Sequence, residues 1–140
     1  MKRRDQPGTY FPVPKSVFLV DLAPSEIAIY AYLMSRENRE TYECIVGYEE
    51  IATATGMSKK SVPRHIKKLL LRGLIEVERT KVLMKDGRIR NGKHKYRILP
   101  IEPIAAIYEE RRFRKMLATM QVQRALDEYD AKNKKKGELQ

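Results

Sequence analysis

The sequence predicts a mainly α-helical fold with a small β-sheet, in which three helices precede a β-hairpin and a further helix lies at the C-terminus. Three observations predict it. Apolar residues recur at helical spacings up to Arg72, two β-prone segments flank Asp86-Gly87, and a long helix-prone segment follows Pro103. At 140 residues with 42% hydrophobic side chains, the chain can bury one compact core.

The pattern divides the chain into four parts. We expect a flexible arm at residues 1–9, one folded domain at 10–100, a C-terminal helix at 101–131 and a disordered basic tail at 132–140. The N-terminus has charges without an apolar segment behind them, and no run of about 18 apolar residues exists. We therefore expect a cytoplasmic protein without a secretory signal or a membrane span.

Residues suited to metal binding or catalysis are scarce. Cys44 is the only cysteine, and His65 and His94 are the only histidines, so a zinc site would lack ligands. Cys44 is expected to be a small buried side chain. The sequence has no Gly-rich phosphate loop, and no serine or cysteine has a plausible neighbouring base. We expect no enzyme activity, cofactor, metal or small-molecule ligand.

The helices are placed by their apolar spacing and their end signals. A first helix is predicted at about residues 24–37 and a second at 48–55, with Gly56 as its C-cap. Ser58 suits an N-cap, because its hydroxyl can accept a hydrogen bond from the free backbone N–H groups of the next turn. The third helix is therefore predicted at residues 58–72.

Pro63 falls within this third helix and lacks a backbone N–H. If Ser58 is the N-cap, the Lys59 carbonyl loses its helical partner in the first turn, which should cost less than the roughly 3 kcal/mol of a mid-helix proline. Our hypothesis is that Pro63 loosens this first turn, frees the Lys59 carbonyl and so shapes how the helix meets its binding partner.

A rotation of about 100° per residue separates two faces of the third helix. His65 lies at their border, where a packed or capping role is expected rather than catalysis. The inward residues are Val62, Ile66, Leu69 and Leu70, and the outward residues are Lys60, Ser61, Arg64, Lys67, Lys68 and Leu71.

The hairpin can be given a register. A short β-prone run, Tyr42 to Val46, comes before the helices that lead to it. If Asp86-Gly87 forms a two-residue tip, paired residues have numbers that add to 173. The apolar pairs are then Ile75 with Ile98 and Val77 with Tyr96, and the charged pairs on the other face are Glu76 with Arg97 and Glu78 with Lys95. This alternation fits a half-buried hairpin, and Asn91-Gly92 is a candidate for a bulge.

The charge is concentrated in one part of the chain. Residues 56–100 hold 14 Lys or Arg and three acidic residues, so they carry a balance of +11, which equals the net charge of the chain. Such a distribution is typical of a surface that binds a polyanion.

Three helices followed by a basic hairpin is the order of a winged helix-turn-helix. Ala52 is small where two helices cross, Gly56 permits the tight turn, and Val62 anchors the third helix. This arrangement presents the third helix, 58–72, to the major groove of double-stranded DNA, with the hairpin at 75–98 as a wing. We expect Arg64 to read a base, since its planar fork can pair with guanine. The other candidate DNA-binding residues are Ser58, Lys59, Lys60, Ser61, Pro63, Lys67 and Lys68 at the helix, and Lys85, Arg88, Arg90 and Lys93 in the wing.

Two stretches carry a resemblance to known families. "IATATGMSKKSVPRHIKKLLLRGLIEVER" is similar to the core of bacterial winged-helix regulators. Together with "YFPVPKSVF" and "LAPSEIAIYAYLMSR", it resembles the N-terminal domain of RepA-type replication initiators and related proteins of Gram-positive plasmids and conjugative elements, with Pro14, Lys15 and Phe18 as the matching residues. The resemblance covers about residues 10–99. It implies DNA binding, and a role in either replication initiation or transcriptional control.

Two questions stay open at this level. Some winged-helix domains bind proteins and no DNA, although these usually lack a strongly basic third helix. The apolar stripe from Phe113 to Met120 either forms a homodimer contact or packs against the first helix of its own chain.

Overall fold

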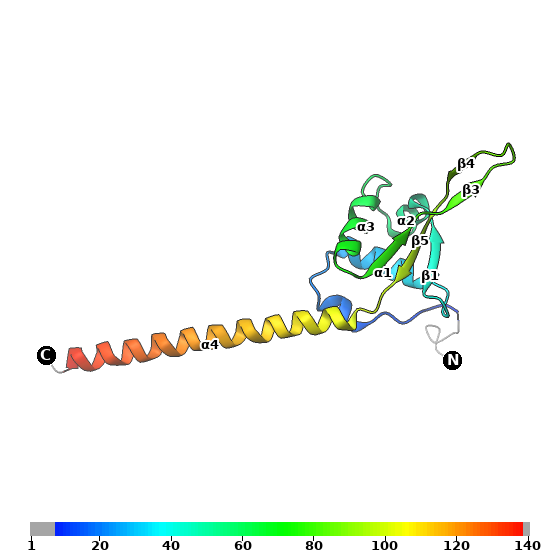
Figure 1. Cartoon of the computed structure of the whole chain (residues 1–140). Helices are drawn as coiled ribbons and strands as arrows, with labels where there is room; N and C mark the ends of the chain where they lie inside the picture. Colours follow the sequence, from blue (N-terminus) through cyan, green and yellow to red (C-terminus); the bar gives the residue numbers. More distant parts are fainter. Residues whose placement is uncertain (1–7, 139–140) are drawn as a thin grey trace. The chain divides into compact units, whose positions relative to one another are not determined.

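A computed structural model of the chain describes residues 8–138 (Figure 1). Residues 1–7 of the predicted arm and residues 139–140 of the predicted tail lie outside this part. The chain divides into two units, Met1–Ile104 and Ala105–Gln140. After a 3₁₀ turn, Lys15–Phe18, the elements are α1 (Pro24–Arg36), β1 (Glu43–Val46), α2 (Tyr48–Thr55), α3 (Val62–Leu71), β2 (Ile75–Glu78), β3 (Lys81–Leu83), β4 (Ile89–Asn91), β5 (His94–Ile98) and α4 (Glu102–Glu138).

The first two helices confirm the sequence prediction. Pro24 begins α1, where its missing N–H has no helical partner to lose, and Glu26 lies in the first turn. Helix α2 ends at Gly56, which has a left-handed backbone with φ of 73° and whose N–H donates to the Ala52 carbonyl. A side chain is disfavoured in that conformation, so glycine suits this end of the helix.

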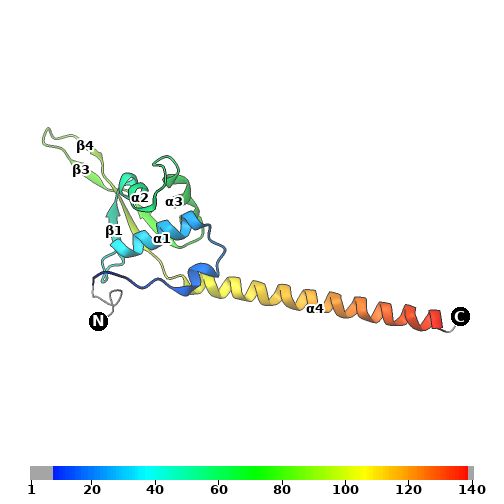
Figure 2. The ribbon, with the colours of Figure 1, turned by 180° about the vertical axis from the view of Figure 1, so that it is seen from behind.

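The main sheet has the strand order β1-β5-β2, and both of its pairings are antiparallel. The predicted register of the hairpin is confirmed for all four pairs between β2 and β5, from Ile75 with Ile98 to Glu78 with Lys95. The β-prone run before α2 forms β1, which adds to the other edge of β5. Helices α1, α2 and α3 lie on one face of this sheet (Figures 1 and 2).

The outer part of the hairpin differs from the prediction. Strands β3 and β4 pair Leu83 with Ile89, one residue away from the expected register. The Met84 N–H donates to the Arg88 carbonyl at 2.7 Å, so the tip has three residues and not two. Gly87 closes it with φ of 86°, as three-residue hairpin loops commonly require.

A bulge reconciles the two registers. The Gly92 N–H donates to the Thr80 carbonyl at 2.8 Å, whereas Glu78 pairs with Lys95. Two residues of the returning strand therefore lie opposite one residue of the outgoing strand, which is the definition of a bulge. It lies next to Asn91-Gly92, where the sequence indicated one.

The core of the first unit lies between the three helices and the inner face of the sheet. Cys44 is 7% exposed, as predicted, and burial raises the pKa of its thiol to about 11. The least exposed apolar side chains are Val17, Val20, Ile29, Tyr30, Leu33, Val46, Ile51, Val62, Leu69, Leu74, Ile75, Tyr96 and Ile101.

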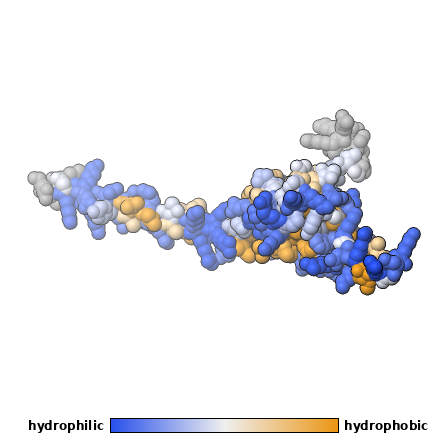
Figure 3. Space-filling model, turned by 90° about the horizontal axis from the view of Figure 1, so that it is seen from above, coloured by the Kyte–Doolittle hydropathy of each residue, from blue (hydrophilic) through white to orange (hydrophobic). Residues whose placement is uncertain are grey.

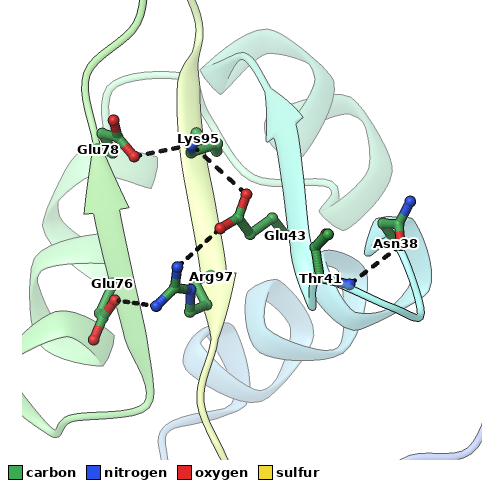
Figure 4. Close-up of polar contacts among 7 residues, drawn as sticks. All are labelled: Asn38, Thr41, Glu43, Glu76, Glu78, Lys95 and Arg97. Carbon is green, nitrogen blue, oxygen red and sulfur yellow. Dashed lines mark hydrogen bonds and ion pairs between the residues drawn. The ribbon is translucent and has the colours of Figure 1, made fainter.

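The opposite face of the sheet carries charged side chains in a ladder (Figure 4). Glu43 of β1 contacts both cations of β5, Arg97 at 3.0 Å and Lys95 at 3.6 Å. On β2, Glu76 and Glu78 contact the same two cations at 3.4 and 3.0 Å. Opposite charges thus lie side by side across three strands, as the register predicts.

The second unit consists of most of α4, one uninterrupted helix that ends at Glu138. The predicted disordered tail is wrong for residues 132–138, because the helix continues through them. The lysine-rich end suits a helix C-terminus, where positive charge interacts favourably with the helix dipole. Within residues 8–138, no helix is both long and apolar enough for a transmembrane segment.

Candidate nucleic-acid interface

The turn between α2 and α3 sets the start of the third helix. The Ser61 N–H and hydroxyl both donate to the Ser58 carbonyl, at 3.1 and 2.9 Å, and the first helical residue is Val62. The predicted N-cap at Ser58 and the predicted helix over 58–72 are therefore wrong at their start, because residues 58–61 form a turn of their own. The helix spans Val62–Leu71.

This start changes the role of Pro63. It is the second residue of α3, and the first helical bond is donated by the His65 N–H to the Ser61 carbonyl. N–H groups of the first turn have no helical acceptor, so a proline there removes no helical bond. The expected loss of a bond to the Lys59 carbonyl does not occur.

The inner face of α3 anchors it to the domain. Val62, Ile66 and Leu69 are at most 5% exposed, as predicted. Leu70 was expected inward and is 44% exposed, because it lies about 80° around the helix from Val62, beyond the packed stripe. Leu71 is exposed, as predicted.

His65 is packed at the border of this face, also as predicted. It is 9% exposed, and the Ser25 hydroxyl oxygen lies 3.2 Å from its Nδ1 atom. Burial lowers the pKa of His65, and the positive charges of Arg64 and Lys68 lower it further. The ring therefore stays neutral at pH 7 and contributes packing rather than charge.

A buried ion pair that the sequence did not indicate fixes the other end of α3. Glu26 is 2% exposed, and the Arg72 Nε atom lies 3.0 Å from its carboxylate. The Arg72 guanidinium also donates to the carbonyls of Val20 and Asp21. Arg72 is thus turned inward and does not belong to the basic surface, although its position in sequence gave no sign of this.

The outer face of α3 presents free positive charge. Lys60, Arg64, Lys67 and Lys68 are exposed, and no ion pair within residues 8–138 involves them. Ser58 and Pro63 are also exposed, and Ser61 is half-buried. Every residue that the sequence placed on the outward side near this helix therefore reaches the surface.

Two predicted phosphate ligands have acidic partners instead. The Lys59 Nζ atom lies 2.8 Å from Glu49, and Lys93 is hydrogen-bonded to Glu50. Both acids lie in the first turn of α2, and the hydrogen bonds from Lys59 and Lys93 lower the pKa of Glu49 and Glu50. At the start of α2, the negative charges of Glu49 and Glu50 also interact favourably with the helix dipole.

The wing supplies the second group of cations. Every residue of β3 and β4 is exposed, and so are Lys85, Arg88 and Arg90. Arg88 lies 3.6 Å from Asp86, in a contact open to solvent that contributes little to stability. A groove of about 1310 Å³ separates the wing from the start of α2. Its lining includes Lys59, Lys81, Arg90 and Lys93.

Among the described residues, no three His, Cys, Asp or Glu side chains are grouped as ligands for a metal ion. What the surface offers is exposed guanidinium and ammonium groups on a rigid helix, together with a basic hairpin beside it. Such groups bind phosphates and the acceptor atoms of bases.

Comparison with known proteins agrees with this geometry. Residues 20–75, which span α1 to α3, match a family model described as a helix-turn-helix domain. In the structure, α3 leads directly into the β2–β5 hairpin and its basic wing. The fold of this part of the chain is that of a winged helix-turn-helix.

One solved structure extends the comparison. The chain is similar to a possible transcriptional regulator from Methanosarcina mazei Go1, with a TM-score of 0.54 and 13% identity over 79% of this chain and 88% of that chain. At this identity the likeness concerns the fold. No curated protein matches the chain. The match to a helix-turn-helix domain supports a DNA-binding role.

Proposed function

We propose that the chain binds double-stranded DNA in a sequence-specific manner, with α3 in the major groove and the wing on the flanking backbone. The observation that carries this proposal is the outer face of α3. Arg64, Lys67 and Lys68 are exposed there and unpaired within the described residues, opposite an apolar stripe that holds the helix rigid. A helix fixed on one side and cationic on the other suits groove binding.

The cations fall into groups with different roles in this proposal. Arg64 reads guanine through two hydrogen bonds, while Lys60, Lys67 and Lys68 contact phosphates. In the wing, Lys85, Arg88 and Arg90 reach a minor groove or the flanking phosphates. Lys59 and Lys93 contribute only when a phosphate replaces Glu49 or Glu50 as their partner. Ser58 and Ser61 in the turn before α3, and Pro63 in its first turn, approach the DNA backbone.

The resemblance and the fold support a proposal for the biological role. A winged helix-turn-helix domain with these features supports control of transcription or of replication initiation in the bacterial cytoplasm, at the nucleoid. The resemblance to RepA-type initiators favours a plasmid or a conjugative element as the setting. A regulator would select inverted half-sites, whereas an initiator would select direct repeats.

The proposal is tested by selecting bound sequences from a random DNA pool with the full chain. We expect a defined motif, and Arg64→Ala should lose discrimination at one base pair by about 1–3 kcal/mol. Arg39→Ala is the matched control, because Arg39 is an exposed arginine of the same domain in the α1–β1 loop. A pool that shows no enrichment would favour a protein-binding winged helix.

Salt dependence tests the phosphate contacts separately. Among the predicted DNA-binding residues, six exposed cations lack an ion pair within the described chain, namely Lys60, Arg64, Lys67, Lys68, Lys85 and Arg90. If they all contact phosphates or bases near the backbone, the logarithm of affinity should fall with that of salt concentration with a slope of about −5. Lys67→Ala should reduce this slope by about one without changing the preferred sequence. A nearly flat dependence contradicts the proposal.

A further inference from the structure

Helix α4 carries an apolar patch without a covering element in the described chain. Phe113, Met116, Leu117 and Met120 are 40–55% exposed, although large apolar side chains normally find a partner. Their spacings of three and four residues place them on one face of the helix. Figure 3 shows that apolar side chains, in orange, reach the surface of α4 between hydrophilic ones in blue.

The two ends of this patch carry opposite charges. Glu109 lies one turn before Phe113, and Arg124 lies one turn after Met120, both on the face of the patch. Neither takes part in an ion pair within residues 8–138. In contrast, neighbouring Glu110 is already paired with Arg114 at 2.7 Å.

We propose that this face binds the same face of a second copy, with the two helices antiparallel and centred between Met116 and Leu117. Phe113 then lies opposite the partner's Met120, and Met116 lies opposite the partner's Leu117. Glu109 lies opposite the partner's Arg124, and two-fold symmetry repeats each contact. The patch is self-complementary in this register.

The charges select this direction. A parallel pair in register places Glu109 against the partner's Glu109 and Arg124 against the partner's Arg124. Like charges at both ends would oppose association, whereas the antiparallel pair joins opposite charges at both ends. The occupant of the patch is therefore a second copy in the opposite orientation.

The rise of a helix converts this register into a distance. Ala105, the first residue of the second unit, lies 11.5 residues from the centre, so the two copies of Ala105 are about 34 Å apart along the helix axis at about 1.5 Å per residue. An antiparallel pair has two-fold symmetry, so together with the proposed DNA binding, on which this step rests, it predicts inverted half-sites.

The proposed contact between the two helices is small, so its strength depends on whether the two copies are free or bound to the same DNA. About two helical turns from each copy bury less than the roughly 1,200 Å² of a stable interface. We expect weak self-association of the free chain and cooperative binding to DNA with two half-sites, because the first site raises the effective concentration for the second.

Cysteine cross-linking tests the direction without DNA. Two variants of the full chain are made, and both contain Cys44→Ala, which removes the only native thiol. One variant adds Phe113→Cys and the other adds Met120→Cys. Oxidised glutathione serves as the oxidant. We expect disulfide dimers when the two variants are mixed and few with either alone, since equal positions lie about 10 Å apart along the axis in this register.

Each other cross-linking result overturns the proposal. Efficient dimers of a single variant indicate parallel helices. If no variant or mixture forms dimers, the patch has another occupant, such as the first helix of its own chain. Leu126→Cys is the control, because Leu126 is exposed on α4 outside this face.

Charge exchange tests the ends of the patch. Glu109→Arg and Arg124→Glu should each weaken dimerisation about tenfold, because two attractive pairs become repulsive. The double variant should restore dimerisation. Sedimentation equilibrium measures the dimerisation of all three variants. If the double variant is as weak as either single one, the pairing is wrong. Loss of DNA binding with intact cross-linking would instead refute only the proposed function.

Discussion

The hairpin after α3 has an inner half and an outer half that differ in what holds them. In the inner half, β2 and β5 bury Ile75 and Tyr96 at 0–1% exposure, and their other face carries the charge ladder. In the outer half, β3 and β4 are exposed on both faces. The hairpin thus changes from half-buried to exposed on both faces at the bulge beside Gly92.

The difference separates stability from binding. Apolar burial and cross-strand pairs stabilise the inner half, so its register is fixed by the fold. Only backbone hydrogen bonds and a few local contacts hold the outer half, which leaves its side chains available to a ligand. The predictions below test this division, from the largest expected effect to the smallest.

The largest effect should come from removing a core side chain of the inner half. Tyr96→Ala leaves a cavity at a fully buried position and should lower the free energy of unfolding by about 3–5 kcal/mol. Ile89→Ala, at a position 66% exposed in the outer half, should lower it by less than about 0.5 kcal/mol. Urea unfolding of both variants measures the difference. Similar losses would show that the outer half belongs to the core.

Gly92→Ala addresses the junction between the halves. An added Cβ at Gly92 would lie 2.5 Å from the Thr80 Oγ1 atom and 2.9 Å from the Val82 Cγ2 atom. We expect a loss of about 1–3 kcal/mol and faster hydrogen exchange at the Met84 amide, because the outer ladder must shift. Gly137→Ala is the control, since nothing lies within 4 Å of its added Cβ. An unchanged exchange rate would mean that the wing does not depend on this close approach.

The two halves also differ in how far the sequence predicted them. The alternation of apolar and charged residues determined the inner register, because a slip by one residue would have put Glu76 into the core. In the outer half both faces are exposed, so no pattern distinguished one register from the next. Asp86-Gly87 then favoured a two-residue tip, and the close approach of Gly92 to Thr80 had no signal in the sequence.

The helix-turn-helix shows the same limit. The spacing of apolar residues predicted the buried stripe of α3, because any helix packed on one side buries residues at helical spacing. It did not predict where α3 begins, since Ser58 and Ser61 are both good N-cap residues and only the turn between them decides. The inward turn of Arg72 toward Glu26 depends on a contact across 46 positions of sequence, which local pattern does not encode.

A smaller effect should come from two buried tyrosine hydroxyls. The Tyr30 hydroxyl donates to the Leu99 carbonyl at 3.0 Å, whereas the Tyr96 hydroxyl has no hydrogen-bond partner among the described residues. Tyr30→Phe should therefore cost about 1 kcal/mol, and Tyr96→Phe should be neutral or stabilising by up to about 1 kcal/mol. Thermal unfolding of the two matched variants measures this. Equal losses would indicate that Tyr96 has a partner in solution.

The smallest effect should come from the charge ladder on the outer face of the inner half. The hydrogen bond from Arg97, followed by the charges of Lys95 and Arg97, lowers the pKa of Glu43 from 4.5. A carboxyl group whose pKa is lower in the folded state stabilises the fold above its unfolded pKa. This stabilisation is lost as the pH falls through the folded pKa, so the contribution of Glu43 should disappear in acid below pH 4.5. Because Glu43 is only half-buried and its partner Arg97 is exposed, the effect should be small and should weaken with salt.

Glu43→Gln isolates this contribution within the ladder. The variant should be less stable than the unchanged chain at pH 7, and the two stabilities should converge as the pH falls toward 3, because protonated Glu43 resembles glutamine in charge. Glu40→Gln is the matched control, since Glu40 lies in the loop before β1 and outside the ladder. Urea unfolding at several pH values provides the curves. Parallel curves for Glu43→Gln and the unchanged chain would show that the ladder contributes no pH-dependent stability through Glu43.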